Sequence, residues 1–312
     1  MTDMQRQRAP IPALRILALA LALAAQPGLA RDQAKPVHAA VFPMPAGGMI
    51  GVEDAYFSPD FWIARQRAPD QVLMDRATID ARNARLLRED DSMHDLSALP
   101  ATLTRAQVTG WIDDLASPPA KPLWDEAGKP IAKATLETVV GNRAMDAIPA
   151  SQATRYGMAV ERAALRTFPT ALRVFSSQGE TDIDRFQESA LFPGDPVVIA
   201  HASADGRWLF VVSMRYAAWV QASAIAEGDK ASVLGYGTRV PYRVITGAKP
   251  RTVFTREEPR LSELQLDMGL RLPLDGVAQD RSANGQYAYT SWILDLPVRN
   301  ADGHLGFAPA LL

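Results

Sequence analysis

The chain has 312 residues, of which 47% are hydrophobic and 22% charged, which is the composition of a globular protein rather than a disordered one. Its 33 Lys and Arg against 35 Asp and Glu leave a net charge of −2, so no basic excess points to nucleic acid as a partner. There is no Cys, which excludes disulfides, cysteine-ligated zinc and a thiol nucleophile within these residues. The four His are too far apart in sequence for a short-range metal motif, and neither a metal nor another cofactor is expected.

Residues 1–30 have the pattern of a secretory signal. Arg6, Arg8 and Arg15 precede an uncharged apolar run over 16–25, and small residues follow over 28–30. A run of this length falls short of the roughly 20 residues that a spanning helix needs. We therefore expect cleavage, a periplasmic or secreted product and no membrane contact afterwards; the alternative is an uncleaved anchor.

The next part, residues 31–148, is predicted to be a mainly helical clip domain. Residues 31–51 hold several Pro and Gly and little periodicity, so an extended strap is expected there. Thr104 and Gln107 have the spacing of a capping box. Apolar spacing predicts helices over Thr78–Leu87, from Thr104 to Leu115 and over Ala132–Asp146.

From Arg166 the hydrophobic pattern changes toward a period of two. Residues 196–200 form a short Val- and Ile-rich run, and Ser203–Gly206 is a hairpin turn signal. An alternating strand follows from Trp208 to Val212, and another short strand covers Tyr216 to Val220. Short strands with turns between them predict a small barrel over 149–228 rather than a parallel sheet.

An internal repeat suggests a second barrel over 229–312. The turn at Asp205-Gly206 and the aromatic that follows it are echoed at Asn284-Gly285 and Tyr287. The fold class expected is therefore mainly β, with two small barrels preceded by a helical clip. Such an echo can also arise by chance in a chain rich in strands.

The motif search finds no catalytic signature. A Gly-x-Ser-x-Gly elbow, a His-Glu-x-x-His motif and a phosphate-binding loop are all missing from the sequence. The aromatic residues are more informative. Trp208 and Tyr287 are expected in the core because each starts an alternating strand. Tyr216 and Trp219 are candidates for a groove that stacks on a sugar or peptide, with packing inside the barrel as the alternative for both.

Several of these segments resemble parts of exported NlpC-type cell-wall peptidases. LRTFPT from Leu165, DRFQESALFPGDPVVIAHASADGRWLFVVS from Asp184 and RYAAWV from Arg215 resemble their bacterial SH3 domain. Ala218 stands where that family usually has Gly. FWIARQRAPDQVLMD from Phe61 is similar to their N-terminal clip, and 228–312 to their second SH3-like domain. The resemblance implies two SH3-like barrels behind a stabilising clip.

The resemblance also implies a binding role. In those enzymes a Cys-His domain follows and cleaves peptidoglycan stem peptides beside γ-linked D-glutamate, and the first SH3-like domain walls the substrate cleft. No counterpart of that Cys occurs here. We therefore expect a non-catalytic module that recognises stem peptides through Tyr216, Arg215 and Trp219. It would be either a truncated peptidase or the partner of a separately encoded cysteine peptidase domain. The alternatives are a structural or adaptor protein without a wall ligand, and a hydrolase that uses carboxylates.

Overall fold

The computed structural model describes residues 50–276 and 282–312. The chain divides into two compact units, Met1–Asp75 and Arg76–Leu312. The expected signal segment and nearly all of the expected strap lie outside the described residues. The described part of the first unit contains the short helices η1 (Asp54–Phe57) and α2 (Pro59–Ile63), and no residue in it is buried.

Aromatic contacts hold this part of the first unit together. The rings of Tyr56, Phe61 and Trp62 contact one another, with centroids 4.8 to 5.9 Å apart. The indole N–H of Trp62 donates to the carbonyl of Tyr56 at 2.8 Å, and the Arg65 guanidinium lies 3.2 Å above the Phe61 ring. These contacts are local in sequence and do not amount to a hydrophobic core.

The second unit begins with three helices, which are α3 (Arg76–Glu89), α4 (Arg105–Leu115) and α5 (Lys133–Gly141). All three predicted helices are confirmed, although α5 ends five residues before Asp146. The short strands β1 (Thr102–Thr104) and β2 (Ser151–Ala153) pair antiparallel and were not predicted. Among the described residues, no helix is long and apolar enough to cross a bilayer.

A capping box opens α4, as the sequence predicts. The Gln107 backbone N–H donates to the Thr104 hydroxyl at 3.3 Å, and the Thr104 backbone N–H donates to the Gln107 side chain at 2.9 Å. Both bonds satisfy backbone donors that the first turn would otherwise leave open.

Replacing Thr104 with Ala should therefore destabilise the second unit by about 1 kcal/mol, the usual cost of losing a helix cap. Urea unfolding followed by circular dichroism would measure it. Thr138→Ala is the matched control, because Thr138 lies inside α5 and bonds only to the carbonyl of Ala134 in its own helix. Equal stability of the two variants would contradict a role for the cap.

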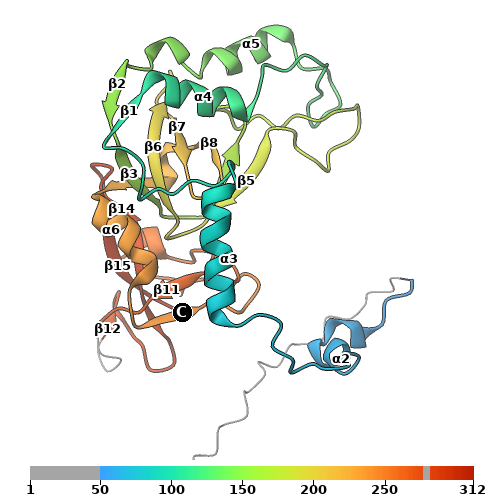
Figure 1. Ribbon diagram of the computed structural model, residues 1–312, viewed down its shortest axis with the longest axis vertical. Coiled ribbons are helices and arrows are strands. Elements are labelled where there is room, and N and C mark those ends of the chain that lie inside the picture. The colour runs from blue at the N-terminus through green and yellow to red at the C-terminus, as the bar shows by residue number, and fades with distance from the viewer. Residues whose placement is uncertain (1–49, 277–281) are drawn as a thin grey trace, which may run out of the picture. The chain divides into compact units, whose positions relative to one another are not determined.

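The centre of the second unit is a seven-stranded antiparallel sheet, called here the barrel sheet, with the order β5-β4-β8-β7-β6-β3-β9. Figure 1 shows α4 and α5 beside its strands β6 to β8. The pairing is antiparallel throughout, so the expected mainly β fold without a parallel sheet is observed. The strands are β3 (Arg155–Ala159), β4 (Ala163–Arg166), β5 (Gln187–Leu191), β6 (Pro196–Ala202), β7 (Trp208–Val212), β8 (Ala217–Gln221) and β9 (Ile225–Gly228).

Both faces of the barrel sheet are buried. One face packs Val198, Phe210 and Trp219 with Val108 and Ile112 of α4 in a single cluster. The side chains that alternate with them belong to a second apolar cluster, formed by Val197, Ile199, Val211, Ala218, Val220 and other residues. Helix α4 is thus part of the core that covers the sheet. The expected 31–148 clip stays a prediction, and α4, which lies within it, belongs to the same compact unit as the barrel sheet.

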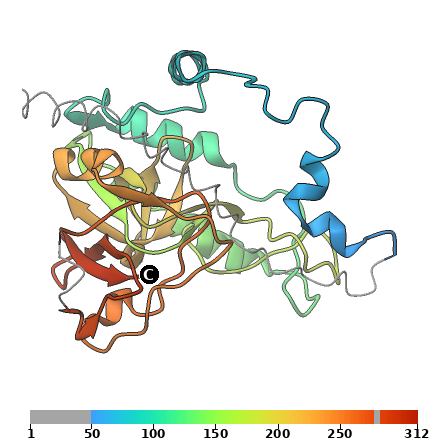
Figure 2. The ribbon, with the colours of Figure 1, turned by 90° about the horizontal axis from the view of Figure 1, so that it is seen from below.

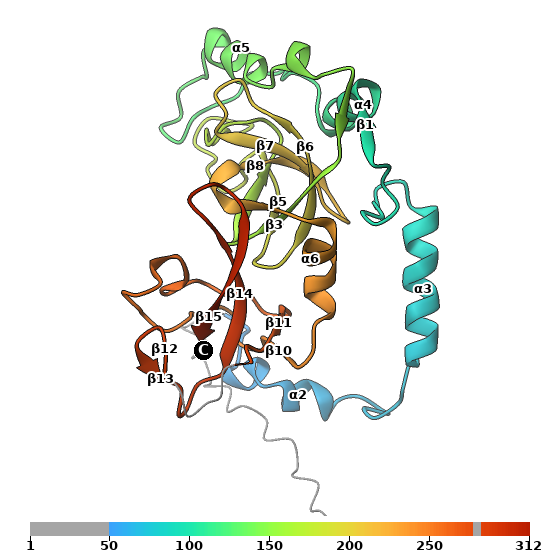
Figure 3. The same ribbon diagram turned by 90° about the vertical axis from the view of Figure 1, so that its left-hand side faces the viewer.

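The C-terminal part of the second unit differs from the expected second barrel. It contains α6 (Lys230–Gly235) and three separate two-stranded ladders in the part of the chain that the structure describes. Figure 3 shows the long β14–β15 ribbon extending toward the barrel sheet, and Figure 2 shows the C-terminus in this part of the unit. The ladders join β10 (Tyr242–Val244) to β11 (Arg271–Pro273), β12 (Ser282–Ala283) to β13 (Gln286–Tyr287) and β14 (Ile293–Arg299) to β15 (Leu305–Leu311).

The repeated turn itself is present. Asn284 and Gly285 have φ of 51° and 70°, as a tight hairpin between β12 and β13 requires. The strands on either side have two residues each, however, and the Tyr287 side chain is 64% exposed. The prediction that Tyr287 lies in the core is wrong, whereas Trp208, at 6% exposed, is buried as predicted.

The barrel sheet and the C-terminal part share a tight contact at Gly194. This residue has φ of +95°, and a Cβ there would lie 2.6 Å from the Tyr236 ring. Tyr236 in turn stacks on Phe307 of β15, with centroids 5.4 Å apart. Only glycine fits this position, because both its conformation and the neighbouring ring exclude a side chain.

Candidate functional site

A groove lies at one end of strand β7, where the chain turns into β8. It has a volume of about 560 Å³ and is called here the Tyr216 groove. Its walls come from the segment after α3, from the turn between β5 and β6, and from the β7–β8 turn. The residues that line it include His94, Leu96, Leu165, Leu191, Asp195, Ser213, Arg215 and Tyr216.

The β7–β8 turn is held by its own hydrogen bonds. The backbone N–H of Ser213 donates to the Tyr216 carbonyl at 2.8 Å, and the N–H of Tyr216 donates to the Ser213 hydroxyl at 3.1 Å. Arg215 and Met214 at the tip are exposed. The turn therefore presents Arg215 and Tyr216 on a short backbone that its own hydrogen bonds hold in place.

Tyr216 is linked through its hydroxyl to β5. The hydroxyl donates to the Glu188 carboxylate, which also accepts from the Thr167 hydroxyl. Burial and then the hydrogen bond to Glu188 raise the pKa of Tyr216 to about 12. At neutral pH the side chain is a neutral phenol, and Glu188 is oriented by two hydroxyl donors.

Asp195 is a carboxylate among the residues that line the groove. Asp195 accepts a hydrogen bond from the backbone N–H of Phe192 at 2.8 Å. Burial raises the pKa of Asp195 above its usual value, while this bond and the positive charge of Arg215 act in the opposite direction. Asp195 and Arg215, which both line the groove, thus interact electrostatically.

His94 also lines the groove. Its backbone N–H donates to the Met214 carbonyl at 2.8 Å, which ties the segment after α3 to the β7–β8 turn. Its ring packs edge-on against Trp111 of α4, with centroids 6.2 Å apart. Partial burial lowers the pKa of His94, so the ring is neutral at neutral pH.

Trp219, the third residue proposed for binding, is placed differently. Its side chain is 0% exposed and packs edge-on against Phe210 in the cluster beneath α4. It therefore does not face the Tyr216 groove, and the structure corrects the expectation of a ligand contact in favour of packing inside the fold. Its indole N–H has no hydrogen-bond partner among the described residues.

The sequence reasoning did not single out Glu188, Asp195 or His94. Asp195 ends a Phe-Pro-Gly-Asp turn, and a short side chain that caps its own turn was a usable signal. His94 reaches the groove only because the chain from α3 passes over the β7–β8 turn. The described residues contain no group of three or more His, Cys, Asp or Glu side chains arranged to hold a metal ion.

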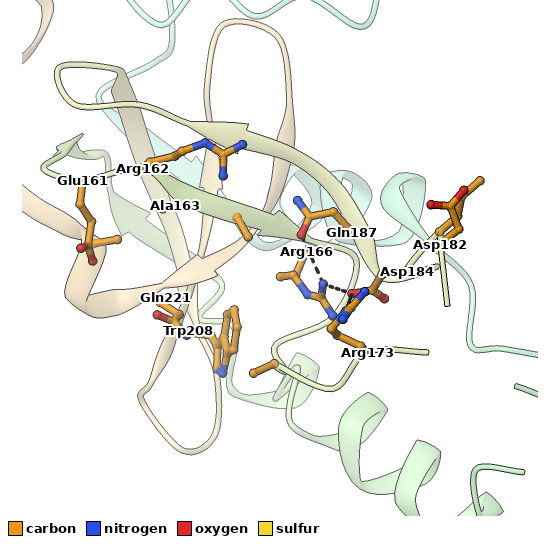
Figure 4. Close-up of a pocket in the computed structure, with 14 residues that line it drawn as sticks. Glu161, Arg162, Ala163, Arg166, Arg173, Asp182, Asp184, Gln187, Trp208 and Gln221 are labelled. Carbon is orange, nitrogen blue, oxygen red and sulfur yellow. Dashed lines mark hydrogen bonds and ion pairs between the residues drawn. The ribbon is translucent and has the colours of Figure 1, made fainter. Parts of the chain in front are cut away.

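An ion pair is buried near the opposite end of the barrel sheet. Arg166 and Asp184 lie 2.5 Å apart, with 6% and 8% of their side chains exposed. Arg166 also donates to the carbonyls of Thr170 and Leu172, and Asp184 accepts from the backbone N–H groups of Val174 and Phe186. Figure 4 shows the pair beside Gln187. Since every partner is internal, the pair anchors the loop between β4 and β5.

Comparison with known proteins supports part of the sequence resemblance. Residues 173–221 match the family described as SH3 domain (SH3b1 type). The match covers strands β5 to β8, and with them the turn that carries Arg215 and Tyr216. No curated protein matches the chain.

Among solved structures, the chain is similar to one described as "Insights into a novel NlpC/P60 Endopeptidase from Photobacterium damselae subsp. piscicida". The two share 19% sequence identity with a TM-score of 0.58, over 77% of this chain and 52% of that one. The chain thus spans about half the length of that endopeptidase, and at this identity the likeness shows a common fold. The matched residues have the pattern of an SH3b1-type SH3 domain, within a fold shared with an NlpC/P60 endopeptidase.

Proposed function

We propose that the chain is an exported, cell-wall-associated recognition module that binds peptidoglycan stem peptides in the Tyr216 groove. The observation that carries the proposal is the position of this groove. It lies on the β7–β8 turn of the residues that match an SH3b1-type domain, in a fold shared with an NlpC/P60 endopeptidase. The signal-like residues 1–30 support export to the periplasm.

The chemistry of the groove suits a short peptide that carries carboxylates. Leu96, Leu165 and Leu191 supply apolar wall, and Arg215 supplies an exposed cation at the rim. A guanidinium pairs with a carboxylate in a fixed geometry, such as the free carboxylate of a γ-linked glutamate. In this proposal the described residues bind the peptide and do not hydrolyse it.

The affinity should be low. The groove is open, so a short peptide buries only part of its surface in it, and much of the gain is offset by the cost of ordering the peptide. We expect a dissociation constant on the order of 1 mM, which corresponds to roughly −4 kcal/mol. Binding to whole sacculi should be tighter, because each sacculus presents many stem peptides.

Replacing Tyr216 with Ala should weaken stem-peptide binding roughly tenfold, because it removes one groove wall and the hydroxyl that orients Glu188. Titration of a labelled tripeptide stem, followed by fluorescence anisotropy, would measure the change. Tyr287→Ala is the control, because Tyr287 is exposed and lies outside the groove. Unchanged binding by Tyr216→Ala would remove this residue from the site.

Two further experiments address the other functions considered. Pull-down of the full chain on purified sacculi separates a recognition module from an adaptor without a wall ligand, which would stay in the supernatant. Incubation with muropeptides, followed by mass spectrometry, separates binding from hydrolysis. Cleavage products that persist after the protein is repurified would overturn the non-catalytic proposal.

A further inference from the structure

A second hollow lies at the other end of β7 from the Tyr216 groove. It consists of two adjoining cavities of about 610 and 870 Å³, which share Ala171, Trp208 and Gln221 as lining residues. A smaller cavity of about 260 Å³ shares Ser223 and Arg299 with the larger of the two. Together they are called here the barrel-end trough. Because these cavities share lining residues, they form one continuous hollow, with room for several units of a chain-like ligand.

One wall of the trough is held in place by Asn142, the residue that follows α5. Its side-chain amide donates to the Pro169 carbonyl at 2.9 Å, and its side-chain oxygen accepts from the backbone N–H of Asp205 at 3.2 Å. Its own carbonyl accepts from the backbone N–H of Ala204. The helix end, the loop after β4 and the β6–β7 turn are therefore fixed to one another, so a ligand would meet a preformed surface.

The charges that line the trough are largely neutralised. Arg166 pairs with Asp184, and the Arg207 guanidinium lies 3.0 Å from the Asp205 carboxylate. Figure 4 shows Glu161 and Arg162 on one side of the cavity, Asp182 on the other, and Trp208 beside Gln221. With both signs interspersed, the trough has no strong preference for an anion or a cation.

Uncharged polar groups also line the trough and remain available to a ligand. Gln221 is exposed, and its amide makes no hydrogen bond to other described residues. The Ser223 hydroxyl is nearby, and the edge of the Trp208 indole lines both main cavities. An amide and a hydroxyl can each donate and accept, which is what a ligand with many hydroxyl and acetamido groups requires.

We propose that the barrel-end trough binds a saccharide chain, and specifically the uncharged amino-sugar backbone of the same polymer whose peptide occupies the Tyr216 groove. The identity of the polymer rests on the proposed function, whereas the class of ligand rests on the trough itself. The two sites lie at opposite ends of β7, whose five residues span about 17 Å. A glycan strand in the trough would raise the effective concentration of its stem peptides near the groove.

The test measures saccharide binding by the full chain and two variants. Ala171 lines both main cavities and is exposed. A Trp ring at this position can therefore occupy the cavities without displacing the core. Chitotetraose and peptide-free glycan strands are the probes, followed by NMR chemical-shift titration. We expect Ala171→Trp to weaken saccharide binding at least tenfold. Gln221→Ala should weaken it about fivefold through the loss of a ligand hydrogen bond.

Matched controls are Ala127→Trp and Gln178→Ala, both at exposed positions away from the trough. Stem-peptide binding should be unchanged in both trough variants, which separates this proposal from that for the Tyr216 groove. If the full chain binds the saccharide probes but not the stem peptide, the proposed function is overturned and the trough proposal stands. The trough proposal is overturned if the unmodified chain binds neither probe, or if Gln221→Ala and a folded Ala171→Trp both bind like their controls.

Discussion

Replacing Asp184 with Ala should destabilise the second unit by about 3–5 kcal/mol, the usual cost of removing one partner from a buried ion pair. The substitution leaves the Arg166 guanidinium buried without its counter-charge, and it removes the acceptor for the backbone N–H groups of Val174 and Phe186. Asp184→Asn keeps an oxygen acceptor but loses the charge, so its destabilisation should be smaller. Urea unfolding followed by circular dichroism would measure both variants.

The Arg76–Asp80 pair provides the control for this prediction. Here the Arg76 guanidinium lies 2.9 Å from the Asp80 carboxylate, but the Arg76 side chain is 86% exposed and the Asp80 side chain 55% exposed. Solvent screens such a pair, so Asp80→Ala should leave the unfolding midpoint almost unchanged. If Asp184→Ala and Asp80→Ala have the same midpoint, burial does not determine the contribution of the Asp184 pair.

Trp208→Ala should also destabilise the second unit by about 3–5 kcal/mol, as large-to-small changes in a core do. Trp208 is 6% exposed and belongs to the same apolar cluster as Phe210, Val212 and Trp219. Its backbone N–H also donates a hydrogen bond to the Ser203 hydroxyl at 3.1 Å, which closes the β6–β7 turn. The loss of indole volume leaves a cavity that these strands cannot fill without moving.

Trp292→Ala is the matched control, because Trp292 is 43% exposed and its main ring contact is the Arg243 guanidinium at 3.8 Å. Exposed cation–π contacts contribute about 0.5–1 kcal/mol. Differential scanning calorimetry of both variants would show the contrast. A melting temperature unchanged by Trp208→Ala would place that side chain on the surface in solution.

The elements predicted correctly are those whose signals are local in the sequence. The capping box at Thr104 and Gln107 predicts where α4 starts, because the bonds that satisfy the first turn involve residues three apart. The Ser203–Gly206 turn is similar, since Gly206 adopts a φ of +67° that other residues rarely adopt. These signals need no knowledge of what lies elsewhere in the fold.

The incorrect predictions concern partners that are distant in sequence. Tyr287 follows a hairpin turn, as Trp208 does, but β13 ends at Tyr287 itself, and among the described residues it pairs with β12 alone, which leaves that side chain exposed. For Trp219, alternation could not identify an exposed side, because both faces of β8 are buried. The packing of Val108 and Ile112 of α4 against the barrel sheet is likewise a contact between segments far apart in sequence, which local patterns do not predict.

The residues of the candidate site also differ in whether the sequence alone could identify them. Arg215 and Tyr216 were identified from the sequence through their resemblance to a family, and the turn that carries them is closed by bonds within four residues. His94 and Asp195 join them only in the folded chain, the first by its backbone bond to Met214 and the second through the turn before β6. The barrel-end trough also has no local signal, because α5, the loop after β4 and the β6–β7 turn meet there.

By itself, the sequence determined the helices, the hairpin turns and the β character of the residues after Arg166, because backbone bonding and side-chain periodicity act over a few residues. The tertiary structure alone decided which side chains are buried, where the two units divide and which residues line each hollow. Burial depends on what covers a surface, and here the covering elements come from distant parts of the chain. Helix α4, for example, covers Trp219 from more than a hundred residues away.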